Sequence, residues 1–365
     1  MTRIYAALLL ILPFGVCKAD DQTVLLAASR SGRVEVLDPR TLESLGSIKA
    51  LPQIDGVSSD HSGVLFVRAG LAPEYVSCCA LYAIDLKTHE VTKLIDPASS
   101  ITLSPSGQHV LTQRGAVGVE AFSVSTLHQE PGIPRLIAPG VYSLSFSPDG
   151  RLLFGVSNFP TSSLDIFDFD ERNLVRRFTV ARDLVVVGTW VSDSFYLYGY
   201  RKGTGRLWRV KADASALEDP VEFNFPDAAA ECKMWSQEAL GTANQLFLYE
   251  RFGAKIDRRD GCATSIPGGL LSIDPKSGGI LARLAPDCHF ASLISSADSK
   301  ELYGIDVKDT SWSSIGLLRL NTRTGEVLAK RDLNPDVWFI NIATIPSELV
   351  TSDPADEAIY SVTPD

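Results

Sequence analysis

The stretch Tyr142–Gly155, YSLSFSPDGRLLFG, decides how this sequence folds. It contains an apolar segment, then a Ser-Pro-Asp-Gly turn, then a second apolar segment. Asp followed by Gly is a strong signal for a tight turn between two antiparallel strands, because Gly adopts positive φ without steric cost. The stretch therefore predicts a β-hairpin.

The same hairpin pattern repeats along the chain. Gly63, Gly107 and Gly150 occupy matching turns that are 44 and 43 residues apart. Weaker copies of the pattern, in which the turn has decayed or the match is loose, lie at 184–200, 231–249, 292–304 and 341–352. A fixed spacing of this size is the sequence signature of a repeat architecture.

A second pattern follows each copy of the first. It is an alternating strand, then Asp-x-x-Thr or a close variant, then another strand. The Asp or Asn side chain is expected to hydrogen-bond back to the backbone of its turn. The clearest examples pair Asp38 with Thr41, Asp85 with Thr88, Asp274 with Ser277, and Asn321 with Thr324. Each repeat therefore contains four short strands, and no segment shows sustained helical periodicity.

Four antiparallel strands in every 40 to 50 residues are typical of a β-propeller. We predict an all-β fold with seven four-stranded blades, although the spacing is also compatible with six or eight. Residues 23–48 predict three strands without a leading one, and residues 337–365 predict three more. The two ends are therefore expected to share the closing blade, which removes exposed sheet edges. The first strands of the blades are expected to begin near residues 54, 98, 140, 184, 230, 289 and 337.

The first 19 residues have the layout of a secretory signal peptide. A positive start is followed by the apolar run Ile4–Val16 and by small residues at −3 and −1 of a cut after Ala19. We therefore expect a signal peptide at 1–19, one propeller domain at 20–365, and a periplasmic or secreted protein. A lipoprotein signal at Cys17 is the alternative, but Val16 is larger than the residue such a site usually has there.

Composition excludes several classes of protein. The chain is 45% hydrophobic and 21% charged, which is typical of a globular domain and not of a disordered chain. Cleavage after residue 19 would remove two cations and change the net charge from −10 to −12. Nucleic acids and anionic membranes need clustered Lys and Arg, so neither is expected as a partner. No later stretch is long and apolar enough to span a bilayer.

Five cysteines remain after cleavage, an odd number for an oxidising compartment. One interpretation is a single structural disulfide together with buried thiols. The other is that the adjacent pair Cys78-Cys79 is redox-active or contacts a ligand, because adjacent cysteines close a strained and reducible ring when they bond. Sequence leaves the connectivity open among Cys78, Cys79, Cys232, Cys262 and Cys288. No spacing typical of a zinc site is present, so no metal or other cofactor is expected.

The loops that lead into the innermost strands are the default ligand site, because they open onto one end of the central channel of a propeller. Here they are rich in acids and aromatic residues. This predicts either an acidic funnel for a cation, an amine or another polar ligand, or simply a solvated channel mouth. The ligand-binding candidates are Asp55, Tyr142, Asp183, Glu231, His289, Asp336 and Trp338. Cys288 beside His289 is not expected to form a nucleophile–base pair, because neighbours along a strand point to opposite faces.

One repeat is longer than the others. The step from residue 230 to 289 has its excess at about 251–269, a stretch that contains four cations and Cys262. An insertion in one blade often forms a binding loop, so a negatively charged partner is one interpretation and a solvated hairpin the other. The partner-binding candidates are Arg251, Lys255, Arg258 and Arg259.

The units SPDGRLLFGV, LYAIDLKTHEV and LLRLNTRTGEV resemble exported bacterial propellers of the YVTN and quinoprotein-amine-dehydrogenase-like type. The resemblance covers nearly the whole mature chain, but the tyrosine-valine-threonine-asparagine run survives only as fragments such as LFGVSN. The Gly-His and Trp-Asp pairs of WD repeats are missing.

We expect a binding or scaffold module for a protein, peptide or small ligand, because no catalytic motif is evident. The alternative that the resemblance implies is an enzyme or enzyme subunit with a channel-mouth site. That would be an amine-dehydrogenase-like quinoprotein subunit or a lactonase-like hydrolase.

Overall fold

The computed structural model describes most of the chain after residue 20. The described residues are 21–49, 51, 54–59, 63–70, 79–88, 90–114, 118–133, 141–158, 161–182, 184–201, 204–211, 213–224, 237–250, 269–308, 313–346, 358–359 and 361–362. Within these ranges the regular elements are all β-strands. In that part of the chain no helix is long and apolar enough to cross a membrane.

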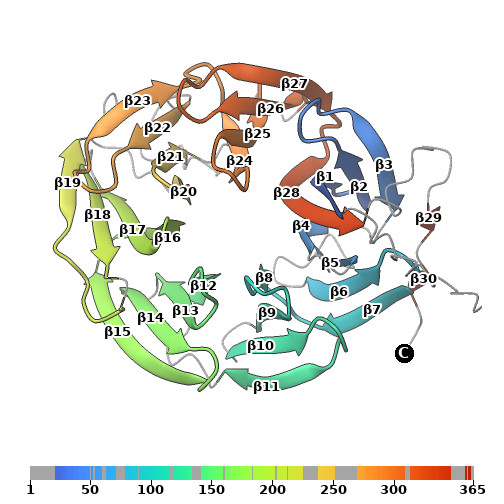
Figure 1. Ribbon diagram of the computed structural model, residues 1–365, viewed down its shortest axis with the longest axis horizontal. Helices are drawn as coiled ribbons and strands as arrows, with labels where there is room; N and C mark the ends of the chain where they lie inside the picture. The colour runs from blue at the N-terminus through green and yellow to red at the C-terminus, as the bar shows by residue number, and fades with distance from the viewer. Residues whose placement is uncertain are drawn as a thin grey trace, which may run out of the picture.

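The strands form seven antiparallel blades arranged around a central axis (Figure 1). In chain order, the first complete blade has β4 (Ile54–Ser59), β5 (Val64–Ala69), β6 (Ala80–Asp85) and β7 (Glu90–Ile95). The second has β8 (Thr102–Leu103), β9 (His109–Arg114), β10 (Gly118–Ser123) and β11 (Gln129–Ile133). The third has β12 (Val141–Phe146), β13 (Leu152–Ser157), β14 (Ser162–Asp168) and β15 (Asn173–Ala181).

The next three blades repeat the same order from the axis outward. The fourth has β16 (Val186–Val191), β17 (Ser194–Arg201), β18 (Thr204–Val210) and β19 (Val221–Asn224). The fifth has β20 (Gln237–Gly241), β21 (Leu246–Glu250), β22 (Leu270–Ile273) and β23 (Ile280–Leu284). The sixth has β24 (Phe290–Ser295), β25 (Glu301–Val307), β26 (Ile315–Asn321) and β27 (Val327–Leu333).

The closing blade joins the two ends of the chain, as predicted. Its innermost strand is β28 (Val337–Pro346), which pairs with β1 (Asp21–Ser29). Outward from β1 follow β2 (Arg33–Leu37) and β3 (Ser44–Lys49). Antiparallel hydrogen bonds between β1 and β28 therefore close the ring, and the seven-bladed prediction is confirmed over six and eight.

The C-terminal part differs from the expectation of three ordinary strands. Residues 341–346, expected to begin a hairpin, instead complete the ten-residue β28. The surplus strands are two short pairings at outer edges. They are β29 (Ala358–Ile359), parallel to β3, and β30 (Ser361–Val362), parallel to β7. The reason is geometric: β1–β3 already complete the blade, so only outer edges remain for further strands.

The Asp-x-x-Thr turns form as predicted. Asp38 Oδ1 accepts hydrogen bonds from the backbone N–H of Arg40 and Thr41, at 2.6 and 3.0 Å. Asp85 and Asn321 repeat this arrangement in their own blades. These side chains satisfy turn N–H groups that have no strand partner, which explains the recurrence of an Asx residue at the end of the third strand.

The Ser-x-Asp-Gly turns are built by their serine. Ser147 Oγ donates to Asp149 at 2.5 Å and accepts the Leu152 N–H at 2.9 Å, while Gly150 has φ +77°. Ser296 makes the equivalent bonds to Asp298 and Glu301. The same hydroxyl–carboxylate contact therefore defines the hairpin in the third and the sixth blade.

The apolar core lies between the blades. In one of these layers, Phe154 of the third blade packs against Phe195 and Trp208 of the fourth. The rings of Phe154 and Phe195 are 4.7 Å apart. Full burial of a side chain of this size contributes about 1.5–3 kcal/mol, so the layers between blades hold the ring together.

Two faces of the ring follow from this antiparallel order. We call the face at which the innermost strands begin the upper face; it also carries the loops after each second strand. The lower face carries the Ser-x-Asp-Gly and Asp-x-x-Thr turns. The expected channel-mouth site belongs to the upper face.

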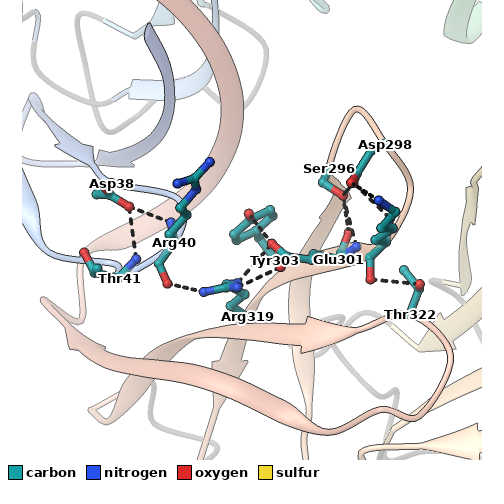
Figure 2. A network of polar contacts seen from close by, with 10 residues as sticks. Asp38, Arg40, Thr41, Ser296, Asp298, Glu301, Tyr303, Arg319 and Thr322 are labelled. Carbon is teal, nitrogen blue, oxygen red and sulfur yellow. Dashed lines mark hydrogen bonds and ion pairs between the residues drawn. The ribbon is translucent and has the colours of Figure 1, made fainter.

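A polar network joins the sixth blade to the closing blade, and we call it the closure seam (Figure 2). Arg319 on β26 makes a two-bond ion pair with Glu301, at 3.0 and 2.7 Å, and also donates to the carbonyl of Arg40 in the β2–β3 turn. Tyr303 donates its hydroxyl to Glu301 at 3.0 Å. Nearby, Arg331 donates to Glu35 and to the Leu42 carbonyl. Side chains from residues 301–331 thus hold the N-terminal strands.

Candidate functional site

The predicted channel-mouth residues lie where innermost strands begin. Asp55, Tyr142 and Trp338 are the second residues of β4, β12 and β28. His289 and Asp336 directly precede β24 and β28, which are neighbouring innermost strands (Figure 1). Asp183 and Glu231 lie outside the described residues. The structure thus describes two of these side chains, His289 and Asp336, and places them on adjacent blades at the upper face.

His289 is held by a buried carboxylate. Its backbone N–H donates to Asp306 Oδ1 at 2.9 Å, and its carbonyl accepts the Val307 N–H at 2.8 Å. Asp306 lies near the upper end of β25 and is only 7% exposed. Asp306 therefore fixes the loop that leads into β24.

Cys288 precedes His289 in that loop and carries a free thiol in this structure. From sequence the two residues are expected along a strand, but in the structure both lie in the loop before β24. Burial raises the pKa of the Cys288 thiol to about 11, and the charges of Asp306 and Asp287 add to the shift. A thiol with this pKa stays protonated near neutral pH, so it has little nucleophilic character.

Asp336 ties β28 to the N-terminal strands. Its Oδ2 accepts the Ser31 N–H at 3.1 Å, and its carbonyl accepts the Arg30 N–H at 2.9 Å. Its other carboxylate oxygen, Oδ1, is buried and has no hydrogen-bond partner among the described residues. A buried carboxylate oxygen usually has a hydrogen-bond partner. A ligand cation or hydrogen-bond donor could supply that partner to Oδ1.

Asp287, Asp306 and Asp336 make this part of the upper face acidic. Asp287 is exposed, whereas Asp306 is buried and Asp336 half-buried. The described residues contain no group of three or more His, Cys, Asp or Glu side chains that could hold a metal ion. What this arrangement offers chemically is negative charge and hydrogen-bond acceptors.

Sequence reasoning missed Asp306 and Asn158, both at upper ends of second strands. Asn158 bridges two blades: its Nδ2 donates to the Val186 carbonyl at 2.9 Å and its Oδ1 accepts the Val186 N–H at 2.8 Å. The only signal for either is a polar residue at the end of an otherwise apolar strand. Such a residue does not reveal its partner, because that partner is another loop.

Other predicted sites lie wholly or partly outside the described residues. The basic loop residues Arg251, Lys255, Arg258 and Arg259 lie outside the described residues, between β21 and β22. Cys78, Cys232 and Cys262 also lie outside the described residues. Cys79 is half-buried and directly precedes β6. Disulfide pairing and the partner loop stay predictions.

Comparison with known proteins supports the fold. No protein-family model matches the chain, and no curated protein matches it by sequence. Similar solved structures include hydrazine synthase from Kuenenia stuttgartiensis, at 13% identity and a TM-score of 0.55, over 79% of this chain and 89% of that one. At this identity the likeness shows a shared propeller fold.

Two further solved structures are similar to this chain at the level of the fold. Dihydro-heme d1 dehydrogenase NirN in complex with DHE is 12% identical with a TM-score of 0.52, over 87% of this chain and 74% of that chain. The tricorn protease is 11% identical with a TM-score of 0.55, over 88% of this chain and 34% of that chain. Their activities are not transferred to this protein by the fold.

Proposed function

We propose that this protein is an exported binding module that takes a cationic ligand, such as an amine or a lysine-containing peptide, at the upper face beside β24 and β28. The observation that carries the proposal is the buried Asp336 Oδ1, which has no hydrogen-bond partner among the described residues. A ligand ammonium group would supply both the donor and the charge that this oxygen needs.

The surrounding charge supports a cation rather than an anion. Burial is the main cause of the raised pKa of the Cys288 thiol, and the negative charges of Asp306 and Asp287 raise it further. These two carboxylates would attract a ligand cation to this region. The predicted signal peptide at residues 1–19 and the resemblance to exported propellers are the grounds for proposing action outside the cytoplasm. The same burial and charges disfavour Cys288 as a nucleophile.

The test is the affinity of the full chain for a trilysine peptide and for putrescine, measured by isothermal titration calorimetry. Asp336→Asn removes the charge and is expected to weaken binding about tenfold, because one charge-assisted hydrogen bond is lost. Asp219→Asn is the matched control, since Asp219 is exposed on the lower face. Unchanged affinity in Asp336→Asn would overturn the proposal.

The enzyme alternative makes a different prediction. A quinoprotein subunit would carry a quinone that redox-cycling staining detects in the protein isolated from its source. A channel-mouth hydrolase would depend on Asp183 and Glu231, so Asp183→Asn with Glu231→Gln would abolish turnover of a lactone substrate. A stoichiometric quinone, or lactone hydrolysis lost in that double variant, would replace binding with catalysis as the function.

A further inference from the structure

The loop between β1 and β2 brings an arginine to the upper face beside Asp336. The backbone N–H of Arg30 donates to the Asp336 carbonyl at 2.9 Å, and the N–H of Ser31 donates to Asp336 Oδ2 at 3.1 Å. Arg30 and Ser31 are both exposed. Arg30 is therefore a direct neighbour of the candidate cation site, although it belongs to the other end of the chain.

The conformation of this loop is fixed by a buried serine. Ser29 is 4% exposed, and its Oγ accepts the Arg33 N–H at 3.1 Å and donates to the Arg33 carbonyl at 2.9 Å. The same oxygen lies 2.8 Å from Ser31 Oγ. Gly32 supplies the positive φ of +92° that the turn requires. The backbone that carries the Arg30 side chain is thus held in one place next to Asp336.

Charges of opposite sign lie on the two sides of Asp336. On the side of the sixth blade are Asp287, in the loop before β24, and Asp306, near the upper end of β25. On the side of the closing blade are Arg30 and Arg33, which flank the β1–β2 turn and are both exposed. Asp336 lies between them, in the loop that leads from β27 to β28. This part of the upper face is therefore dipolar.

We propose that the ligand of the Asp336 site is zwitterionic: an amino acid, free or at the C-terminal end of a peptide. Its ammonium group binds Asp336 Oδ1 and its carboxylate binds the guanidinium of Arg30. The inference rests on the proposed function and narrows the cationic ligand to one that also carries an anion. A guanidinium presents several N–H donors in a planar fork that matches a carboxylate, so Arg30 suits this role.

The dipolar arrangement also disfavours the simplest cationic ligands. A diamine placed on Asp336 would leave its second ammonium group near the cations of the β1–β2 loop, where like charges repel. A zwitterion places its anion there instead. The site should therefore select the ligand with the lower net positive charge, which is the reverse of what the overall acidity of the chain predicts.

The test compares lysine with lysinamide by isothermal titration calorimetry of the full chain. The two ligands differ only at the carboxylate, and lysinamide carries more positive charge. Lysine is expected to bind about tenfold more tightly, which corresponds to about 1.4 kcal/mol. Arg30→Gln is expected to abolish this preference by weakening lysine binding, and Arg30→Lys is expected to retain part of it because the charge is kept.

The matched control is Arg323→Gln. Arg323 is also an exposed arginine in a turn between two strands, but it lies on the lower face. This variant is expected to keep the full preference for lysine. A preference lost equally in Arg323→Gln and Arg30→Gln would show a general effect of net charge and would overturn the role of Arg30.

Asp336→Asn separates this inference from the proposed function. It is expected to weaken the binding of both ligands, since both place an ammonium group on Oδ1. If both ligands depend on Asp336 but bind the parent chain equally, the cation site stands and the zwitterionic ligand is overturned. The same holds if Arg30→Gln keeps the parent's preference. If neither ligand binds, or if Asp336→Asn changes neither affinity, the proposed function fails and this inference fails with it.

Discussion

Arg319→Met tests whether the closure seam stabilises the ring. The substitution removes the two hydrogen bonds to Glu301 and the one to the Arg40 carbonyl while keeping much of the apolar stem. Hydrogen bonding to Glu301 raises the pKa of the Arg319 guanidinium, which agrees with a favourable pair. The bond to the Arg40 carbonyl joins residues 279 positions apart, across the junction that closes the propeller, whereas the two bonds to Glu301 lie within the sixth blade and hold the Arg319 side chain in place (Figure 2).

The expected loss of stability follows from how deeply the Arg319–Glu301 ion pair is buried. The side chains of Arg319 and Glu301 are 19% and 25% exposed, between the solvent-exposed and the fully buried cases. Exposed pairs contribute about 0–1 kcal/mol and breaking a buried pair costs about 3–5 kcal/mol, so we expect a loss of about 2 kcal/mol. With an unfolding entropy of about 2 cal/mol/K per residue, the melting temperature should fall by about 3 °C.

The assay is differential scanning calorimetry of the full chain and two variants. Arg206→Met is the matched control, because the Arg206–Glu222 pair also joins neighbouring strands but has side chains 45% and 54% exposed. Its expected change is within about 0.5 kcal/mol. If Arg319→Met has the same melting temperature as Arg206→Met, these contacts of Arg319 do not stabilise the fold and the reasoning fails.

Three further predictions concern packing, acid and thiol reactivity. Gly241→Ala should destabilise by about 1–3 kcal/mol in urea unfolding, because a Cβ at Gly241 would fall on the backbone carbonyl of Trp190. Hydrogen bonds from the Ser277 hydroxyl and the turn backbone lower the pKa of Asp274 below its usual 3.8. The stability that the Asp274 carboxylate contributes is therefore complete above pH 3.8 and is lost as the pH falls below that value. The urea midpoint should drop in this acid range, and it should drop less in Asp274→Asn. Since burial raises the pKa of the Cys288 thiol to about 11, mass spectrometry should show slow iodoacetamide labelling at pH 7 that accelerates toward pH 11.

Each of these has an outcome that contradicts it. A Gly241→Ala chain as stable as the parent would mean that the two backbones separate at little cost. A urea midpoint that is flat below pH 4, or one equally steep in Asp274→Asn, would remove that turn from the acid response. Fast labelling of Cys288 at pH 7 would show that the thiol is accessible and ionised.

The blade repeat could be predicted from sequence because it is local. A hairpin turn depends on residues within one stretch, such as Ser147 and Asp149, which are in direct contact. The period then sets the number of blades, and the incomplete ends predict a shared closing blade. The start of a strand is harder to predict than its turn, so that β8 begins at Thr102 rather than near residue 98. The start predicted near 230 lies outside the described residues.

The contacts between blades could not be predicted in the same way. Arg319 and Arg331 stand in ordinary strands, and nothing near them in sequence indicates the carbonyls of Arg40 and Leu42. Asp306 is likewise one acid at the end of an apolar strand. Such partners depend on the ring closing, which is a property of the whole chain rather than of one repeat.

Asp336 shows how closure and the candidate site depend on one another. Its carboxylate Oδ2 and its carbonyl bind the β1–β2 loop, so the residue helps to hold β28 in the closing blade. Only Oδ1 remains for a ligand. A ligand cation at that oxygen would bind across the junction of the two chain ends and should stabilise the folded ring by mass action. Binding and stability should therefore fall together in Asp336→Asn, whereas Arg319→Met should lower stability alone.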